Sequence, residues 1–228
     1  MLYDKDIREP LFDWFLEHYG KVRALEEKII GKSRADMVFV LPDAICGVEI
    51  KSDADSYARL ESQVKDYDRF FDVNYVVAGS SHGMHISEHV PSYWGIITVE
   101  ETEAGIDFYM LREPEQKTGV TWPAKLSFLW RPELASLLEA LGLPKYRERS
   151  KPFVIEKITA ATGVKVMEDA VKKEYLRLLF ERDYTAIEGI ISAFKKEQSL
   201  KKAAQKSVNS RRAVRVRVRR KRRSTRRI

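Results

Sequence analysis

Two apolar segments separated only by the dipeptide Pro42-Asp43 constrain the fold more than any other feature of the sequence. "RADMVFVL" (34–41) and "AICGVEIKS" (44–52) have the length and the Val, Ile and Phe content of β-strands. Proline and aspartate favour a turn between them. So short a link joins antiparallel neighbours, because parallel strands need a crossover of a dozen or more residues. The sequence therefore predicts a β-hairpin here.

The segment before the hairpin has helical periodicity. Leu11, Trp14 and Phe15 fall on one stripe of a helix that we expect to end at Gly20. Asp6 is the predicted N-cap, which places Pro10 in the first turn, where proline is tolerated.

Strand and helix patterns continue after the hairpin. "VNYVVAG" (73–79) is almost wholly apolar, as expected for a central strand of a sheet. The other predicted strands are 21–30, 93–101 and 105–113, and the other predicted helical segments are 56–71, 126–143, 151–163 and 166–184. We therefore expect an α/β domain over 1–122, a helical C-terminal region over 123–194, and a basic, disordered tail over 195–228.

The net charge of +7 arises from the end of the chain. The segment 211–227, "RRAVRVRVRRKRRSTRR", holds ten arginines, one lysine and no acid, which leaves a net charge of −4 for residues 1–210. A block of like charge repels itself and attracts polyanions, nucleic acid above all. The predicted nucleic-acid-binding arginines of this tail are Arg211, Arg212, Arg215, Arg217, Arg219 and Arg220.

Composition also limits where the protein acts. No apolar run approaches the roughly 20 residues that a membrane-spanning helix needs. The opening segment "MLYDKDIREP" contains acids and no apolar core typical of a secretory signal. A single cysteine, Cys46, cannot form an internal disulfide. We expect a cytoplasmic protein with no membrane partner.

Three charged residues lie in the apolar hairpin. Alternation along a strand puts Glu49 and Lys51 on one face, and Asp36 lies on the neighbouring strand. Bare charges on a half-buried sheet are unfavourable unless they are paired or bind a metal. Two convergent carboxylates would suit Mg²⁺ or Mn²⁺, and a lysine beside them can offset charge on a phosphate. The alternative is structural: a solvent-facing Asp36 and an ordinary ion pair between Glu49 and Lys51.

The following helical segment adds two polar candidates. Gln63 lies beside the apolar stripe, four residues before Tyr67, so its amide needs a partner near the sheet. It could bond a metal-bound water or a phosphate. Taken alone, a boundary glutamine bonded to the backbone is the simpler interpretation.

Taken together, Asp36, the tripeptide Glu49-Ile50-Lys51, and Gln63-x-x-x-Tyr67 on the next helix resemble the PD-(D/E)XK nuclease superfamily. The Q-x-x-x-Y element is similar to that of its RecB-like branch, and the chain from about Asp6 to Tyr184 resembles a family of uncharacterised bacterial and phage proteins with this core. The resemblance implies a restriction-endonuclease-like fold, a mixed central sheet flanked by helices. It also implies Asp36, Glu49 and the Ile50 carbonyl as metal ligands, Lys51 as the catalytic lysine, and Gln63 and Tyr67 as supporting residues.

Two positions depart from or extend this pattern. Ala35 replaces the proline that usually precedes the aspartate. The glutamate of the first element could be Glu26 or Glu27, of which we favour Glu27. Arg34 and Arg59 also lie in the resembling stretch and are predicted to contact phosphate, although solvated or ion-paired arginines would look the same.

The sequence thus predicts a divalent-metal-dependent nuclease, a hydrolase acting on DNA in repair, recombination or phage DNA processing. The alternative is a non-catalytic nucleic-acid-binding protein, or an adaptor that binds a protein partner through its helical C-terminal region. The pattern leaves open endonuclease or exonuclease action, the choice between DNA and RNA, and strandedness.

Overall fold

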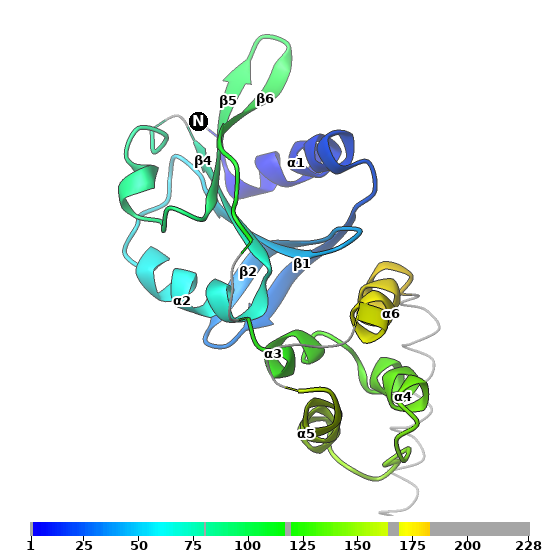
Figure 1. Ribbon diagram of the computed structural model, residues 1–228. Helices are drawn as coiled ribbons and strands as arrows, with labels where there is room; N and C mark the ends of the chain where they lie inside the picture. The colour runs from blue at the N-terminus through cyan, green and yellow to red at the C-terminus, as the bar shows by residue number, and fades with distance from the viewer. Residues whose placement is uncertain (1, 80, 117–119, 164–168, 183–228) are drawn as a thin grey trace, which may run out of the picture. The chain divides into compact units, whose positions relative to one another are not determined.

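A six-stranded mixed sheet forms the centre of the protein (Figure 1). The computed structural model describes residues 2–79, 81–116, 120–163 and 169–182, without the side chain of Glu26. The strands are β1 (Arg23–Ile30), β2 (Ser33–Val40), β3 (Ile45–Lys51), β4 (Val73–Gly79), β5 (Gly95–Thr102) and β6 (Gly105–Arg112), and they lie in sequence order across the sheet. The pairings β3–β4 and β4–β5 are parallel, and the other three are antiparallel.

The apolar character of β3 and β4 explains their central positions. All seven residues of β3 are buried, as are all of β4 except Val73. A strand covered on both faces needs apolar side chains on both, which "VNYVVAG" provides. The predicted hairpin is confirmed, and the Leu41 amide donates to the Ala44 carbonyl (2.9 Å) across its turn.

Two helices cover opposite faces of the sheet (Figure 1). Helix α1 (Asp4–Tyr19) packs Ile7, Leu11 and Phe15 into the main core, against side chains such as Met37 of β2. Helix α2 (Leu60–Phe70) lies on the other face and supplies the crossover that the parallel β3–β4 pair requires. The architecture is therefore α/β, a mixed sheet flanked by helices, as predicted.

Glycine allows α2 to approach the sheet closely. A Cβ atom added to Gly47 of β3 would lie 2.2 Å from the Phe71 ring and 2.7 Å from the Tyr67 ring. Only a residue without a side chain leaves room for these two rings against the strand. The close approach brings the polar side chains of α2 down to the sheet surface.

The start of α1 differs from the prediction. The helix begins at Asp4 with Tyr3 as its N-cap, so Asp6 is the third helical residue, and its carboxylate accepts a hydrogen bond from the Tyr3 amide (3.2 Å). Pro10 consequently lies inside the helix rather than in its first turn. Burial of Leu2 and Ile7 explains the earlier start, because both contribute to the core beneath the first turn.

Short helices follow the sheet. The predicted helical segment 126–143 is helical only over 131–140, and a helix that precedes it ends at Leu126. The Trp130 amide donates to the Glu133 carboxylate (2.6 Å) at the start of the later helix. The helices after the sheet are α3 (Trp122–Leu126), α4 (Arg131–Ala140), α5 (Lys151–Thr162) and α6 (Asp169–Phe180). A 3₁₀ turn, η1 (Ile86–Glu88), precedes β5.

A buried ion pair joins these helices to the sheet. Lys125 of α3 donates to the carboxylate of Asp72, which also accepts the Ile45 amide of β3 (3.0 Å). Tyr175 of α6 donates to the Lys125 carbonyl (3.1 Å). The helices are thus held to the sheet by polar contacts as well as by apolar packing.

The chain divides into two units after Glu181. The second, Arg182–Ile228, lies outside the described residues apart from Arg182, as do the six tail arginines predicted to bind nucleic acid. Among the described helices, none combines the length and the apolar character needed to cross a membrane.

Candidate metal and catalytic site

The register of the hairpin places the two predicted carboxylates opposite each other. Met37 pairs with Val48, so one residue further along each strand Asp36 faces Glu49. Both side chains lie on the face that α2 covers, because Met37 and Val48 belong to the core on the α1 face. The sheet therefore brings together the two residues that the sequence predicted as metal ligands.

Glu49 is the centre of a buried hydrogen-bond network. The residue is 1% exposed, and its Oε1 accepts hydrogen bonds from Lys51 Nζ (2.7 Å) and Gln63 Nε2 (2.5 Å). Gln63 Oε1 in turn accepts from Lys51 Nζ (3.2 Å). Three of the predicted site residues thus form one closed group. A buried carboxylate is tolerated here because it is both paired and hydrogen-bonded.

Tyr67 supports both strands from α2. Its hydroxyl lies 2.8 Å from Glu49 Oε2 and 3.1 Å from the Val48 carbonyl, and it accepts the Asp36 amide at 3.3 Å. Burial and the charge of Glu49 raise the pKa of the Tyr67 phenol well above its usual value, so the group stays protonated and can donate. Tyr67 therefore fixes Glu49 at the point where β2 and β3 meet.

Asp36 is less well accommodated than Glu49. Its Oδ2 accepts the Ile50 amide (2.9 Å). Burial and the negative charge of Glu49 raise the pKa of Asp36 from 3.8 to about 7, against the opposing effects of the Ile50 amide and Lys51. When Asp36 is ionised it therefore faces the negative charge of Glu49, and this repulsion favours the protonated form of Asp36.

These residues fit a divalent cation. Among the described residues Asp36 Oδ1 accepts no hydrogen bond, and Glu49 Oε2 accepts one, so oxygen lone pairs remain on both carboxylates. Oxygen ligands suit Mg²⁺ and Mn²⁺, and Mg²⁺ is often held by only one or two carboxylates together with water and substrate phosphates. A cation would also relieve the repulsion at Asp36. The described part of the chain contains no group of three or more His, Cys, Asp or Glu side chains placed to hold a metal. A site at this position would therefore rest on two carboxylates and a main-chain carbonyl such as that of Ile50.

Glu27, the favoured first-element glutamate, does not join this network. Glu27 lies opposite Asp36 in the β1–β2 register, but its backbone adopts a positive φ of 49°, which interrupts the strand pairing. Its carboxylate is half-exposed and lies 3.3 Å from Arg34 and 3.8 Å from Arg8. The side chain of Glu26 lies outside the described part of the protein.

Two residues near the site were not predicted. Arg8 of α1 forms a forked contact with Asp4, with its nearest nitrogen 2.6 Å from Oδ2, and also approaches Glu27. The charge of Asp4 contributes to the raised pKa of Asp36, which places α1 within electrostatic range of the carboxylates. The signal in the sequence is the Asp4-x-x-x-Arg8 spacing, which marks a helical ion pair but carries no indication of what lies beside it.

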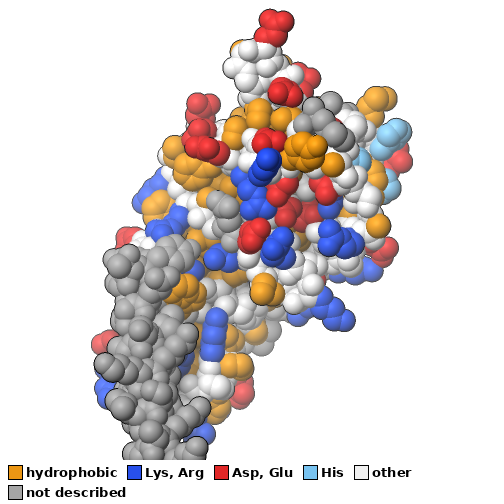
Figure 2. All heavy atoms as spheres, turned by 180° about the vertical axis from the view of Figure 1, so that it is seen from behind, with side chains coloured by type: hydrophobic (Ala, Val, Ile, Leu, Met, Phe, Trp, Pro, Cys, Tyr) orange, Lys and Arg blue, Asp and Glu red, His pale blue; other side chains and the backbone are white. Residues whose placement is uncertain are grey.

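The two predicted phosphate-binding arginines flank the site on different elements. Arg34 lies on β2 with a side chain 59% exposed and paired with Glu27, and exposed Arg59 is the N-cap residue of α2. On the face drawn in Figure 2, acidic side chains gather beside lysines and arginines. The charge on that face is therefore mixed.

The fold and the site together define a class of protein. It is an α/β protein in which a carboxylate pair, a lysine, a glutamine and a tyrosine lie on one face of a mixed sheet. The chain belongs to the family described as bacteriophage P4 protein cII, whose family model matches residues 1–186. Protein cII of Enterobacteria phage P4 is 22% identical over 147 residues, which is 63% of this chain and 55% of that protein. The chain thus spans about half the length of this curated relative. All five residues of the predicted network lie inside the family match.

Proposed function

We propose that the protein is a divalent-metal-dependent nuclease that hydrolyses phosphodiester bonds in DNA. The observation that carries the proposal is that Asp36, Glu49, Lys51, Gln63 and Tyr67, singled out from the sequence and its resemblance to a nuclease superfamily, come together around the buried carboxylate of Glu49. The family is named after a bacteriophage protein, which favours phage DNA processing over repair or recombination as the setting.

The chain's own residues supply distinct parts of this chemistry. Asp36 and Glu49 would hold the cation, with the Ile50 carbonyl as a third ligand, and the cation would polarise the phosphate and lower the pKa of a bound water. Lys51 would offset the negative charge that grows on the phosphate during attack. Gln63 and Tyr67 orient Glu49 through hydrogen bonds of 2.5 and 2.8 Å.

Affinity for DNA would come mainly from outside the site. Residues 1–210 carry a net charge of −4, whereas 211–227 contain eleven basic residues and no acid. Each phosphate that a basic residue neutralises releases counterions, so binding should weaken steeply with salt. Removing residues 211–228 should flatten that dependence and leave the buried network intact.

A cleavage assay tests the proposal directly. Purified full-length protein is incubated with circular and linear, single- and double-stranded DNA, with Mg²⁺, Mn²⁺ or EDTA. We expect cleavage that requires the metal and that falls at least about 100-fold in Lys51→Ala and Asp36→Ala, as for the loss of one charge-stabilising group. Lys65→Ala is the matched control, because Lys65 is an exposed lysine on α2 that pairs with the exposed Glu61. Cleavage that persists unchanged in both site variants would refute the assignment.

One observation favours a second candidate, a non-catalytic nucleic-acid-binding protein. Glu49 accepts hydrogen bonds from Lys51, Gln63 and Tyr67, as a carboxylate in a structural buried pair would. Calorimetric titration with Mn²⁺ separates the two, because only the nuclease requires a binding event that disappears in Asp36→Ala.

A further inference from the structure

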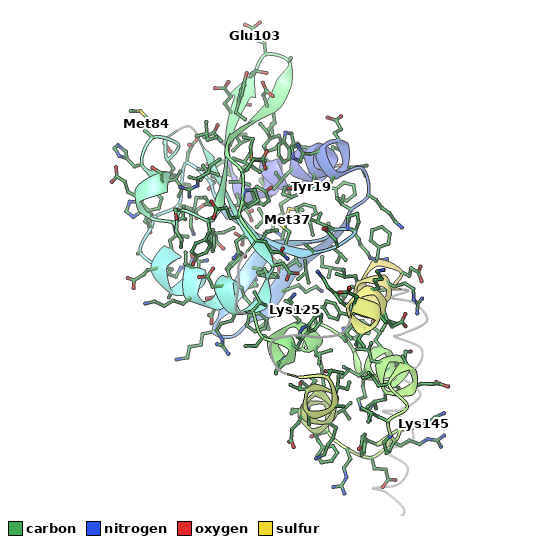
Figure 3. All side chains as sticks on the ribbon, viewed as in Figure 1. Tyr19, Met37, Met84, Glu103, Lys125 and Lys145 are labelled. Atoms are coloured by element: carbon green, nitrogen blue, oxygen red, sulfur yellow. The ribbon has the colours of Figure 1, made fainter. Side chains whose placement is uncertain are left out.

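A basic segment lies where the chain passes from α4 to α5. The residues 145–151, "KYRERSK", include four basic residues and one acid, although residues 1–210 as a whole carry a net charge of −4. Lys145, Arg147 and Arg149 are exposed, and Lys145 lies on the side of the helical region away from the sheet (Figure 3). The proposed nuclease chemistry uses none of these residues.

The loop between the two helices is anchored from α4. The Arg131 guanidinium donates to the Tyr146 carbonyl (2.5 Å) and lies 3.4 Å from the Lys145 carbonyl. Tyr146 has a positive φ of 42°, which a bulky residue rarely adopts. Strained conformations of this kind persist only where the surrounding structure holds them, and they concentrate at functional sites. Lys145 and Arg147 therefore flank a residue whose backbone is held in place.

Two cations gather at one aromatic ring beside this loop. The Arg149 guanidinium carbon lies 5.2 Å from the centroid of the Phe153 ring, and Lys157 Nζ lies 5.1 Å from it. Tyr146 packs edge-on against the same ring at 5.4 Å. Among the described residues, Lys157 pairs with Glu156 (3.6 Å), whereas Arg149 makes no ion pair. Like charges held this close repel each other, and an anion bound at the loop would relieve the repulsion.

The phosphates of a DNA backbone match this surface. Guanidinium groups bind phosphate oxygens through paired N–H donors, and lysine adds a point charge. Duplex DNA carries one negative charge per about 1.7 Å of its axis, so several phosphates lie within reach of one short loop. The rest of residues 1–210 is net acidic, and a local basic surface lowers the repulsion between that part of the chain and DNA.

We propose that the segment 145–151 is a docking surface for the backbone of duplex DNA, with Lys145, Arg147 and Arg149 contacting phosphates. Such contacts position a duplex but do not read its sequence directly. The helical region then orients DNA for the proposed nuclease instead of binding a protein partner. The inference rests on the proposed function for the identity of the substrate, but binding to the segment can be measured without cleavage.

The test is a fluorescence-anisotropy titration of the full chain with a short labelled DNA duplex, in EDTA and at several salt concentrations. The loop variant combines Lys145→Ala, Arg147→Ala and Arg149→Ala. The control variant combines substitutions of three exposed lysines on other elements, Lys32→Ala, Lys65→Ala and Lys173→Ala. Both variants lose the same charge, so a difference between them reports where the charge lies.

We expect the loop variant to lower the slope of log K against log salt by about 2.7, which is about 0.9 for each of three phosphate contacts. The control variant should lower it by less than about 0.9. Arg147→Lys with Arg149→Lys should keep the wild-type slope, because each side chain still neutralises one phosphate. Arg149 packs on Phe153, so the loop variant could fail to fold. In that case Lys145→Ala with Arg147→Ala should lower the slope by about 1.8.

Three results would overturn the docking surface. Equal changes in the loop and control variants would mean that any three charges act alike, and an unchanged slope would mean that the loop does not contact phosphate. A loop variant that keeps its affinity for DNA but loses affinity for polyglutamate would assign the surface to an acidic protein partner. Metal-dependent cleavage with an unchanged slope in the loop variant would refute the docking surface and leave the proposed nuclease intact. A lowered slope in a protein that never cleaves DNA would do the reverse.

Discussion

Replacing Asp36 with asparagine should stabilise the protein in the absence of metal. Burial and the charge of Glu49 raise the pKa of Asp36 from 3.8 to about 7. Folding raises the pKa of this carboxyl group, so the folded state holds the proton more tightly than the unfolded state does. The free energy of unfolding therefore falls as pH rises from the pKa of the unfolded state to that of the folded state. The destabilisation is nearly absent near pH 4, grows until about pH 7, and is constant above it.

The magnitude follows from the size of the shift. About three pKa units correspond to about 4 kcal/mol at pH 8 and about 2 kcal/mol at pH 5. Asparagine is neutral and nearly the same shape, so it can keep the hydrogen bond from the Ile50 amide (2.9 Å in the wild type). Its amino group would also face Glu49, where the wild type has a second negative charge.

The assay is urea unfolding of wild-type protein and of Asp36→Asn in EDTA at pH 5 and pH 8. We expect the variant to be more stable at both, with the gain about 2 kcal/mol larger at the higher pH. Asp43→Asn is the matched control, because Asp43 is exposed in the turn of the same hairpin and should show no such trend. A variant that is destabilised equally at both pH values would refute the reasoning.

Metal should narrow the difference in stability between the two proteins. A cation bound by Asp36 and Glu49 stabilises only the folded wild type, by about 2.7 kcal/mol when its concentration is 100 times the dissociation constant. Adding Mn²⁺ at pH 8 should therefore raise the unfolding free energy of the wild type and leave Asp36→Asn nearly unchanged. An equal response of both proteins would place any bound metal elsewhere.

Three further substitutions test the packing around the site. Tyr67→Phe leaves one oxygen of buried Glu49 without its donor, so urea unfolding should show a loss of about 1–3 kcal/mol, and no loss would mean that water replaces the hydroxyl. Gly47→Ala places a Cβ 2.2 Å from a ring of the α2 segment, so thermal unfolding should show a destabilisation of about 1–3 kcal/mol, whereas unchanged stability would mean that α2 shifts freely. Lys125→Met leaves Asp72 buried without its ion-pair partner, so chemical unfolding should show a loss of about 3–5 kcal/mol. Adding Asp72→Asn should recover much of this loss, and no recovery would mean that the buried charge of Asp72 is not its cause.

The hairpin and its charged residues could be predicted because local rules decide them. A two-residue turn signal forces antiparallel pairing, and alternation along the second strand puts Glu49 and Lys51 on one face. The register that brings Asp36 opposite Glu49 is not fixed by the sequence and comes from the structure. Gln63 could be placed beside them because the apolar stripe of α2 fixes which side of the helix meets the sheet. None of these inferences required knowledge of distant contacts.

The remaining features depend on tertiary contacts that leave weak local signals. Asp6 has the right chemistry for an N-cap, but α1 begins at Asp4 because Leu2 and Ile7 are buried against the sheet. Glu27 departs from strand alternation because its backbone adopts a positive φ. Glutamate rarely adopts this conformation, and no adjacent glycine in the sequence indicates it. Lys125 and Asp72 lie 53 residues apart, and nothing local to either residue indicates that they pair.

The contrast between the two buried lysine–carboxylate pairs bears on whether the site is functional. Asp72 and Lys125 neutralise each other, and Asp72 also accepts the Ile45 amide, as expected of a structural pair. Glu49 and Lys51 have a second carboxylate, Asp36, held directly opposite and at an energetic disadvantage when ionised. Stability alone would favour a neutral side chain at position 36. Ionisable side chains with strongly shifted pKa values concentrate at binding and catalytic sites. If Asp36→Asn stabilises the protein without metal, the wild-type aspartate lowers stability at this position. Such a cost is expected of a residue kept for binding or catalysis rather than for folding.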